Sequence, residues 1–212
     1  MCMTPATLAL LTVNTASRLI LSILLRIISH LDKSRTRLSY NYSHLWRSIL
    51  LLVRFLVTQA SALRHLAGLP DLAAQLTAVL AFALTAGTAF LPNANAYDDL
   101  VYKVFEAGDV LLRFGAEYPS AADTLVVPLK VYEHYHALLQ KHQEGGSRGA
   151  AARALAPREI NRIIRTGHES LELPTIGGLG KWDKTREAEW RNLLKKAARA
   201  VGVDVRRLAT VK

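Results

Sequence analysis

Apolar side chains recur along most of the chain at spacings of three and four residues, the period of one face of an α-helix. Strict alternation of apolar and polar residues over the length of a strand is hard to find. The periodic stretches are separated by short breaks that contain Gly, Pro or Asn, such as Gly68–Pro70 and Pro92–Asn95. The pattern therefore predicts an all-α fold.

The predicted helices occupy nearly the whole chain. Their approximate ranges are 8–31, 42–58, 72–85, 96–114, 121–140, 157–166 and 183–200. Helices joined by short breaks favour antiparallel pairs stacked side by side, as in armadillo and HEAT solenoids, although no exact sequence repeat is visible. Two domains are expected: residues 1–31 as a buried or amphipathic apolar helix, and residues 32–212 as an armadillo-like helical domain with a flexible linker near 143–150.

The first predicted helix, Leu8–Leu31, is long enough to suggest a helix that spans a membrane, and most of its residues are apolar. Two arginines, Arg18 and Arg26, interrupt it, and they lie on one narrow polar stripe with Ser22. We therefore expect a helix that is buried on most of its circumference. An interfacial helix and a spanning helix stay open as alternatives, and an exposed apolar face would make the segment a membrane or partner surface. No basic segment precedes the apolar run, which argues against a secretory signal.

Composition narrows the class of protein. Half of the 212 residues are hydrophobic, which excludes an intrinsically disordered chain. The single cysteine, Cys2, excludes a disulfide framework and indicates a reducing, intracellular compartment.

The net charge of +10 is concentrated at two ends of the chain. Residues 18–65 carry eight basic side chains and one acidic one, and residues 181–212 carry ten and four, whereas the middle is slightly acidic. Any partner that recognises this charge is therefore expected at the ends. The basic side chains are interpreted first as a solvated helical face, and a contact with an anionic membrane surface or an acidic protein is the functional alternative. The candidate contacts are Arg35, Arg37, Lys195, Lys196, Arg199, Arg206 and Arg207.

The residues that resemble catalytic, cofactor or metal motifs are explained by structural roles or have the wrong spacing for a site. His134 and His136 lie two residues apart and face different sides of a helix, so they do not share a metal ion. Gly177–Lys181 lacks the spacing of a phosphate-binding loop. Asp98 and Asp99 are interpreted as first-turn residues of a helix, where acids favour the macrodipole. No nucleic-acid motif accompanies the basic ends. We therefore expect no enzyme activity, no cofactor, no metal, no nucleic acid and no small-molecule substrate.

A family pattern runs from the second to the fourth predicted helix. Its segments are Arg37–Tyr40, Leu45–Ser48, Leu51–Leu56, Leu84–Pro92 and Tyr97–Tyr102. Together they resemble the C-terminal region of the armadillo-like helical domain-containing proteins, a eukaryotic family with many fungal members. The resemblance is good over about residues 35–115 and is limited to helical pattern over 155–210. The motif positions are Trp46, Phe55, Gly87, Phe90, Leu91, Pro92, Tyr97, Asp98 and Leu100.

These motif positions are expected to have structural roles. Trp46 and Phe55 are predicted core anchors, and Gly87 is predicted to permit a close turn. Tyr97 is expected just before a helix, as part of a hydrophobic staple, with Asp98 in the first turn.

The resemblance implies a non-enzymatic scaffold for proteins of the secretory pathway. Animal members of the family are associated with the Golgi and with recruitment of an Arf guanine-nucleotide exchange factor and a phosphatidylinositol 4-kinase. A cytosolic protein peripheral to Golgi membranes is therefore expected, with a membrane protein inserted through residues 8–31 as the alternative. The chain departs from the family pattern at Thr88 and at Val101–Lys103, so any acidic contact at those positions is not carried over. Family chains are longer, and this one is expected to correspond to a C-terminal portion, a truncated form or a short copy.

Overall fold

The computed structural model describes residues 5–145, 157–176, 191, 192, 195, 196, 198 and 199. The chain divides into two compact units, residues 1–180 and residues 181–212. All regular structure among the described residues is helical, which confirms the all-α prediction. The elements of the first unit are α1 (Pro5–Ser34), α2 (Tyr42–Thr58), α3 (Ala60–Leu63), α4 (Leu69–Phe90), α5 (Ala94–Glu106), α6 (Gly108–Glu117), η1 (Pro119–Ala121), α7 (Ala122–Gly145), α8 (Pro157–Gly167) and η2 (His168–Ser170).

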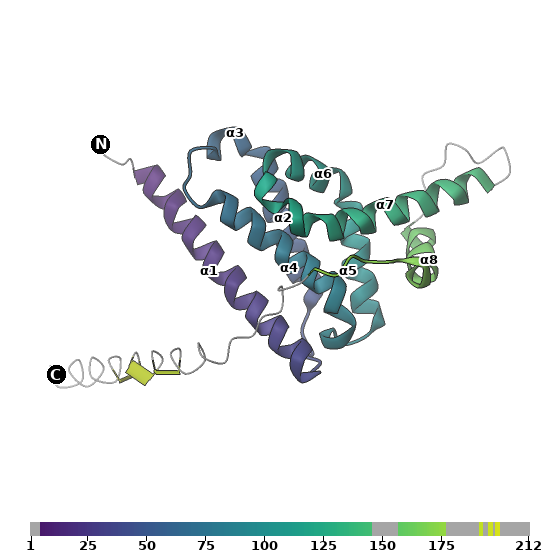
Figure 1. The fold of residues 1–212 in the computed structure, drawn as a ribbon, viewed down its shortest axis with the longest axis horizontal. Coiled ribbons are helices and arrows are strands. Elements are labelled where there is room, and N and C mark those ends of the chain that lie inside the picture. The colour runs from purple at the N-terminus through teal and green to yellow at the C-terminus, as the bar shows by residue number, and fades with distance from the viewer. Residues whose placement is uncertain (1–4, 146–156, 177–190, 193–194, 197, 200–212) are drawn as a thin grey trace. The chain divides into compact units, whose positions relative to one another are not determined.

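The helices of the first unit form two layers (Figure 1). In one layer α4 lies between α1 and α7, and in the other α5 packs against both α2 and α8. Two hydrogen bonds fix the direction of α1 relative to α4: the Asn14 side chain donates to the Ala67 carbonyl at 2.8 Å, and Arg18 binds Asp71 at 2.8 Å. Both bonds join residues 53 positions apart, so the two helices run in the same direction. Corresponding helices of successive solenoid repeats stack in this way.

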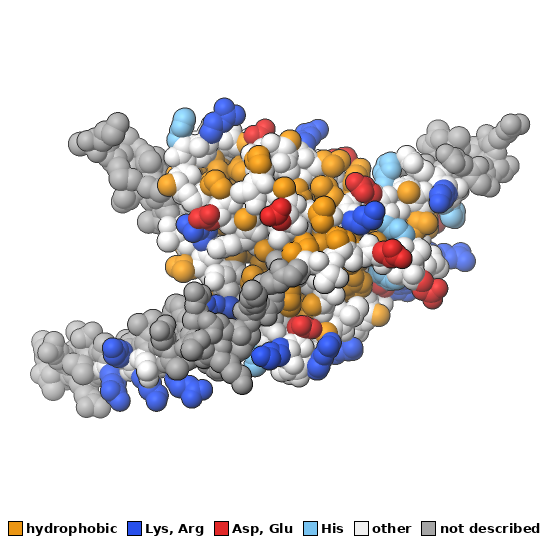
Figure 2. Space-filling model, in the orientation of Figure 1, with side chains coloured by type: hydrophobic (Ala, Val, Ile, Leu, Met, Phe, Trp, Pro, Cys, Tyr) orange, Lys and Arg blue, Asp and Glu red, His pale blue; other side chains and the backbone are white. Residues whose placement is uncertain are grey.

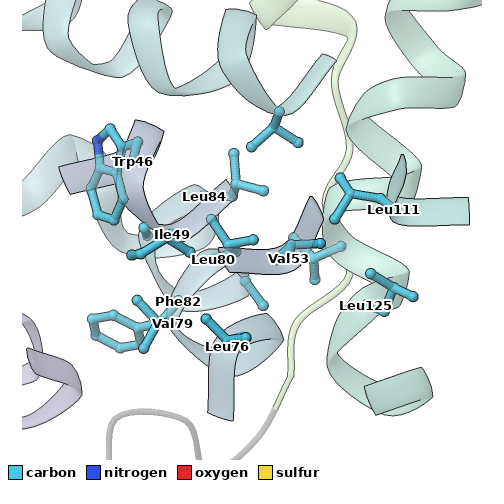
Figure 3. Close-up of a cluster of buried hydrophobic side chains, with 14 of the residues drawn as sticks. Trp46, Ile49, Val53, Leu76, Val79, Leu80, Phe82, Leu84, Leu111 and Leu125 are labelled. Carbon is cyan, nitrogen blue, oxygen red and sulfur yellow. The ribbon is translucent and has the colours of Figure 1, made fainter. Parts of the chain in front are cut away.

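The core is centred on α4, whose side chains are buried around nearly its whole circumference. A helix that is apolar on all sides is stable in water only when other helices cover it, and α1, α5 and α7 do so. Figure 3 shows α4 side chains packed against residues of α2, α6 and α7. The labelled members of this cluster are Trp46, Ile49, Val53, Leu76, Val79, Leu80, Phe82, Leu84, Leu111 and Leu125.

Helix boundaries differ most from the prediction in α4, α5 and α6, and α1 and α7 are each a few residues longer than predicted. The predicted helix 96–114 is two helices, because the chain breaks at Ala107, between the end of α5 and the start of α6 at Gly108. The predicted helix 72–85 is longer at both ends, and Gly87 lies inside α4 instead of in the break after it. The predicted helices 42–58 and 157–166 are confirmed within one residue.

The remaining predictions fall partly outside the described residues. α7 continues to Gly145, and residues 146–150 of the linker predicted near 143–150 lie outside the described residues. The described positions of the second unit, between residues 191 and 199, are helical and exposed.

Candidate functional site

Asp98, one of the motif residues of α5, lies at the centre of a group of polar side chains. α5 begins at Ala94, and the side chain of Asn93 caps it by accepting a 2.9 Å hydrogen bond from the Ala96 amide. Asp98 is therefore in the second turn, and its predicted place in the first turn is wrong. Its side chain is only 13% exposed, and a buried carboxylate needs charged or hydrogen-bonding partners.

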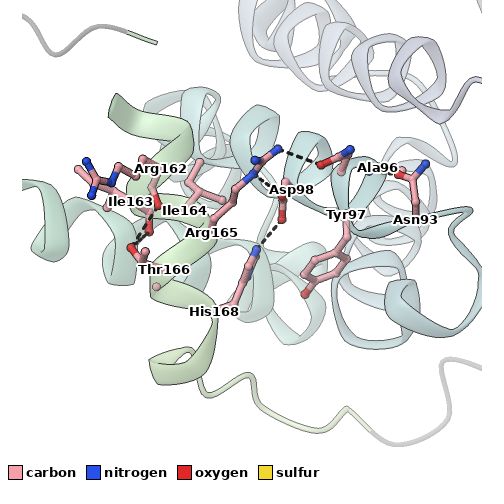
Figure 4. Close-up of polar contacts among 12 residues, drawn as sticks. Asn93, Ala96, Tyr97, Asp98, Arg162, Ile163, Ile164, Arg165, Thr166 and His168 are labelled. Atoms are coloured by element: carbon pink, nitrogen blue, oxygen red, sulfur yellow. Dashed lines mark hydrogen bonds and ion pairs between the residues drawn. The ribbon is translucent and has the colours of Figure 1, made fainter. Parts of the chain in front are cut away.

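Asp98 finds those partners on the segment that follows α7 (Figure 4). Arg165 Nε donates to one carboxylate oxygen at 3.0 Å, and His168 Nε2 lies 2.8 Å from the other. Arg165 also donates to the Asn95 side-chain oxygen at 2.9 Å. We call Asn95, Asp98, Arg165 and His168 the Asp98 junction. It fastens α8 and η2 to α5.

Two side chains of α7 support the same segment. The Tyr135 hydroxyl lies 3.3 Å from the Ile164 carbonyl and 3.1 Å from His168 Nδ1. His134 Nε2 lies 3.1 Å from the Gly167 carbonyl. Both ring nitrogens of His168 and the Nε2 atom of His134 thus contact other protein groups, and these contacts hold α8 and η2 against α7.

Burial raises the pKa values of two tyrosines next to the Asp98 junction, Tyr97 and Tyr135. Burial, reinforced by the negative charge of Asp98, raises the pKa of Tyr97 to about 12. The same burial raises the pKa of Tyr135 above its ordinary value. Both hydroxyls therefore stay protonated at neutral pH, and Tyr97 donates to the Leu84 carbonyl at 2.8 Å.

Gly87 allows Tyr97 to approach α4 closely. A Cβ atom at position 87 would lie 3.0 Å from the Tyr97 ring and 3.2 Å from Leu91. The predicted turn at Gly87 is therefore wrong, and the residue serves the contact between α4 and α5. Tyr97 belongs to the body of α5, not to a staple before it.

The other motif residues divide between core and surface. Trp46, Phe90, Leu91 and Leu100 are buried, and Pro92 lies in the short connection between α4 and α5. Tyr42 links two of them, with its ring 5.9 Å from Trp46 and 6.1 Å from Phe90. Phe55 is 49% exposed, so its predicted role as a core anchor is wrong. It lies on the face of α2 opposite Trp46, Val53 and the other buried residues of that helix.

The basic residues proposed for anionic contacts have different surroundings. Arg37 donates to the Thr88 carbonyl at 3.2 Å, in the last turn of α4, and Arg35 lies 3.9 Å from Asp32. Lys195, Lys196 and Arg199 are exposed. Arg206 and Arg207 lie outside the described residues. An anionic contact through any of these residues stays a prediction.

An exposed apolar row lies on α1. Its members are Leu19, Ile20, Ile23 and Ile27. Their spacing places them on one side of the helix, while Leu21 and Ile28 are buried. Over residues 14–34, where the burial of the α1 side chains is described, the expectation that the helix is buried on most of its circumference is therefore wrong. Figure 2 shows further hydrophobic side chains on the described surface of the first unit, toward the middle of the view.

Among the described residues, α4 is the helix with enough length and apolar character to cross a membrane. More than half of it is buried by other helices, and the core helix of a soluble protein has the same length and composition. No group of three or more His, Cys, Asp or Glu side chains comes together as a metal site in the part of the chain that the structure describes.

The sequence interpretation missed Arg165 and His168. Their signal was weak, because Asp98 lies 67 and 70 positions away from them and nothing local indicates the pairing. One available sign was the row of arginines at 158, 162 and 165, whose spacing puts them on one side of α8.

Comparison with known proteins supports the family pattern. The family described as "Armadillo-like helical domain-containing protein 3, C-terminal" matches residues 10–207. The proteins named armadillo-like helical domain-containing protein 3 from Danio rerio and Homo sapiens are 21% and 20% identical to the chain over 197 residues. The aligned region covers 86% of this chain and 28% of each relative. No solved structure matches the chain.

Armadillo-like helical domains are helical modules for protein interaction, and the family's names indicate a scaffold instead of a catalyst. The family match extends over nearly the whole chain and includes both sides of the Asp98 junction. The chain therefore belongs to the family formed by the C-terminal region of armadillo-like helical domain-containing protein 3.

Proposed function

We propose that the chain is a non-enzymatic helical scaffold that holds protein partners on the cytosolic side of Golgi membranes. By resemblance, the partners are regulators of the secretory pathway, an Arf exchange factor or a phosphatidylinositol 4-kinase. The observation that carries the proposal is the exposed apolar row of α1 in a family of protein-interaction domains. Large apolar side chains gathered on one surface are typical of an interaction site.

The geometry of α1 favours a helical partner. Leu21 and Ile28 pack against the rest of the unit, whereas Ile20 and Ile23 point to solvent. In the layer that contains α1, α4 and α7, α4 has a neighbour on each side. An amphipathic helix of a partner that packed on Ile20 and Ile23 would extend this layer by the same side-by-side stacking.

The proposal is tested by expressing the tagged full chain in cells. We expect it to lie at the Golgi and to co-purify with an Arf exchange factor or a phosphatidylinositol 4-kinase, each detected with its own antibody. The double substitution Ile20→Glu and Ile23→Glu should remove both results. A matched control is Leu112→Glu with Val126→Glu, since these residues are exposed to a similar extent on α6 and α7.

A diffuse wild-type protein that captures neither regulator would contradict the proposal. So would a Golgi signal and partner capture that both double variants lose equally, because the α1 row would then have no special role.

The second candidate function is that of a membrane protein inserted through residues 8–31, and the apolar row of α1 favours it as well. Arg18 and Asn14 oppose it, because each is hydrogen-bonded to the start of α4 or the loop before it. Extraction of membranes with alkaline carbonate separates the two: a peripheral scaffold is released, whereas an inserted protein stays in the pellet.

A further inference from the structure

A basic pocket lies between α5 and α8, beside the Asp98 junction. Its volume is about 620 Å³, which is within the range of sites that hold small molecules. The lining residues come from these two helices alone: Asn95, Asp98, Asp99, Tyr102, Lys103, Arg158, Arg162 and Arg165. Four of the eight are cationic and two are anionic, so the pocket carries an excess of positive charge.

Both acids in the pocket are already neutralised. Asp98 binds Arg165 at 3.0 Å, and Asp99 binds Lys103 one helical turn along α5. Arg158 and Arg162 are exposed and form no ion pair within the described residues. Figure 4 shows the Arg162 side chain directed away from the Asp98 junction, whereas Arg165 reaches across to α5. Two positive charges therefore stay uncompensated in the pocket.

The position of these arginines is unfavourable for α8 alone. Arg158 lies in the first turn, where the helix macrodipole disfavours a cation. Arg158 and Arg162 are four residues apart, so their like charges repel along the helix. A bound anion would reverse both effects. Asn95 and Asp98 already hold the Arg165 side chain by hydrogen bonds. This side of the pocket therefore keeps its conformation when a ligand binds.

From these observations, we propose that the pocket between α5 and α8 binds a phosphate-bearing anion through Arg158 and Arg162. The planar guanidinium groups present paired N–H donors that match phosphate oxygens. Tyr102, which also lines the pocket, carries a hydroxyl that can donate a hydrogen bond. The phosphate belongs either to a soluble molecule or to a lipid headgroup. The site is separate from the α1 row and from the basic residues Arg35 and Arg37, so it does not depend on the scaffold function proposed above.

The test uses the full chain and two probes. The soluble probe is inorganic pyrophosphate, and the lipid probe is phosphatidylcholine vesicles that contain a phosphatidylinositol phosphate, compared with phosphatidylcholine vesicles alone. Arg158→Gln with Arg162→Gln removes the two unpaired cations. The control is Arg64→Gln with Arg113→Gln, which removes the same charge from exposed positions that do not line this pocket. Circular dichroism establishes that both variants fold.

We expect pyrophosphate to raise the melting temperature of the wild type and the control in a concentration-dependent manner. The affinity of the pocket variant should fall by about tenfold or more, because each arginine contributes charge-assisted hydrogen bonds. If the chain also sediments with the phosphoinositide vesicles, and this depends on Arg158 and Arg162, the ligand is a lipid headgroup. If the chain responds to pyrophosphate alone, the ligand is a soluble anion. The proposal is overturned if neither probe binds, or if both double variants lose binding equally.

Discussion

A single carboxylate, that of Asp98, joins α5 to both α8 and η2. It accepts from Arg165 Nε at 3.0 Å and faces His168 Nε2 at 2.8 Å. In Asp98→Asn the side chain keeps its shape, but its amide nitrogen faces one of these donors. We expect the free energy of unfolding to fall by about 1–3 kcal/mol in urea denaturation, the cost of an unsatisfied buried group.

Asp99→Asn is the matched control for this substitution. Asp99 pairs with Lys103 on the same helix and is more exposed than Asp98. Such i,i+4 pairs contribute about 0.3–0.5 kcal/mol. An equal loss of stability in the two variants would show that the Asp98 junction does not hold α8 in place.

Tyr97 makes stability depend on alkaline pH. Its pKa rises from 10.0 to about 12 on folding, chiefly through burial and then through the charge of Asp98. The unfolded chain therefore loses the proton first as pH rises, and the free energy of unfolding falls between about pH 10 and 12. The contribution of Tyr97 to this slope is up to about 1.4 kcal/mol per pH unit.

Urea denaturation across this pH range measures the slope, and Tyr97→Phe should make it shallower. Tyr97→Phe also loses the hydrogen bond to the Leu84 carbonyl, so its stability is lower at neutral pH. Identical slopes for the two proteins would mean that Tyr97 does not titrate differently in the folded state.

Gly108 is required by the ring of Tyr132. A Cβ atom at position 108 would lie 1.9 Å from that ring, which is far inside contact distance. Gly108→Ala should therefore lower the free energy of unfolding by about 1–3 kcal/mol or more, as overpacking does. Gly115→Ala is the control, because its Cβ would meet the end of the Leu125 side chain at 2.7 Å and rotation of that side chain relieves part of the clash. Thermal or urea unfolding should show a larger loss of stability for Gly108→Ala than for Gly115→Ala, and equal losses would contradict the prediction.

The sequence pattern predicted the burial of some side chains correctly and that of others wrongly. Trp46 and Phe90 are buried in the apolar rows that the helical period defines. Phe55 has the same apolar character but lies on the outer side of α2, because the inner side is already filled by Trp46 and Val53. Asp98 could not be recognised as a junction residue, since its partner Arg165 is remote in sequence.

At the scale of helices, α1 combines a buried and an exposed apolar side. Ile28 is 1% exposed and its neighbour Ile27 is 47% exposed. Ile28→Ala should lower the free energy of unfolding by about 2–5 kcal/mol, because it leaves a cavity in the contact with the core. Ile27→Ala should change it by no more than about 0.5 kcal/mol, as expected at a surface position. Chemical denaturation compares them, and equal costs would contradict the placement of α1.

Helix existence was predictable, but two helix boundaries were not. The apolar residues Leu100, Val104 and Leu111 continue one helical row across the break at Ala107, so periodicity alone predicted one helix. Gly87 indicated a break, yet it is accommodated within α4 because Tyr97 occupies the space that a side chain would need. In both cases tertiary packing decided the outcome, and packing is not visible in the local pattern.

At the scale of the whole molecule, the all-α fold predicts its own spectroscopic signature. The described residues form helices held together by an apolar core and by hydrogen bonds between side chains. We expect the purified full chain to give a strongly helical far-UV circular dichroism spectrum that does not change when a chelator is added. A predominantly β spectrum, or loss of the helical signal with the chelator, would contradict this structure.

The sequence distance across the Asp98 junction sets an order of events during protein synthesis. Arg165 follows Asp98 by 67 positions and His168 follows it by 70. On the ribosome, α5 is therefore complete long before either partner has been made, and the Asp98 carboxylate remains hydrated until α8 leaves the exit tunnel. Contacts of such long range form late because the intervening chain must first be closed into a loop. Attachment of α8 is thus a late step in the folding of this unit, and a pause in translation before residue 165 leaves this junction open.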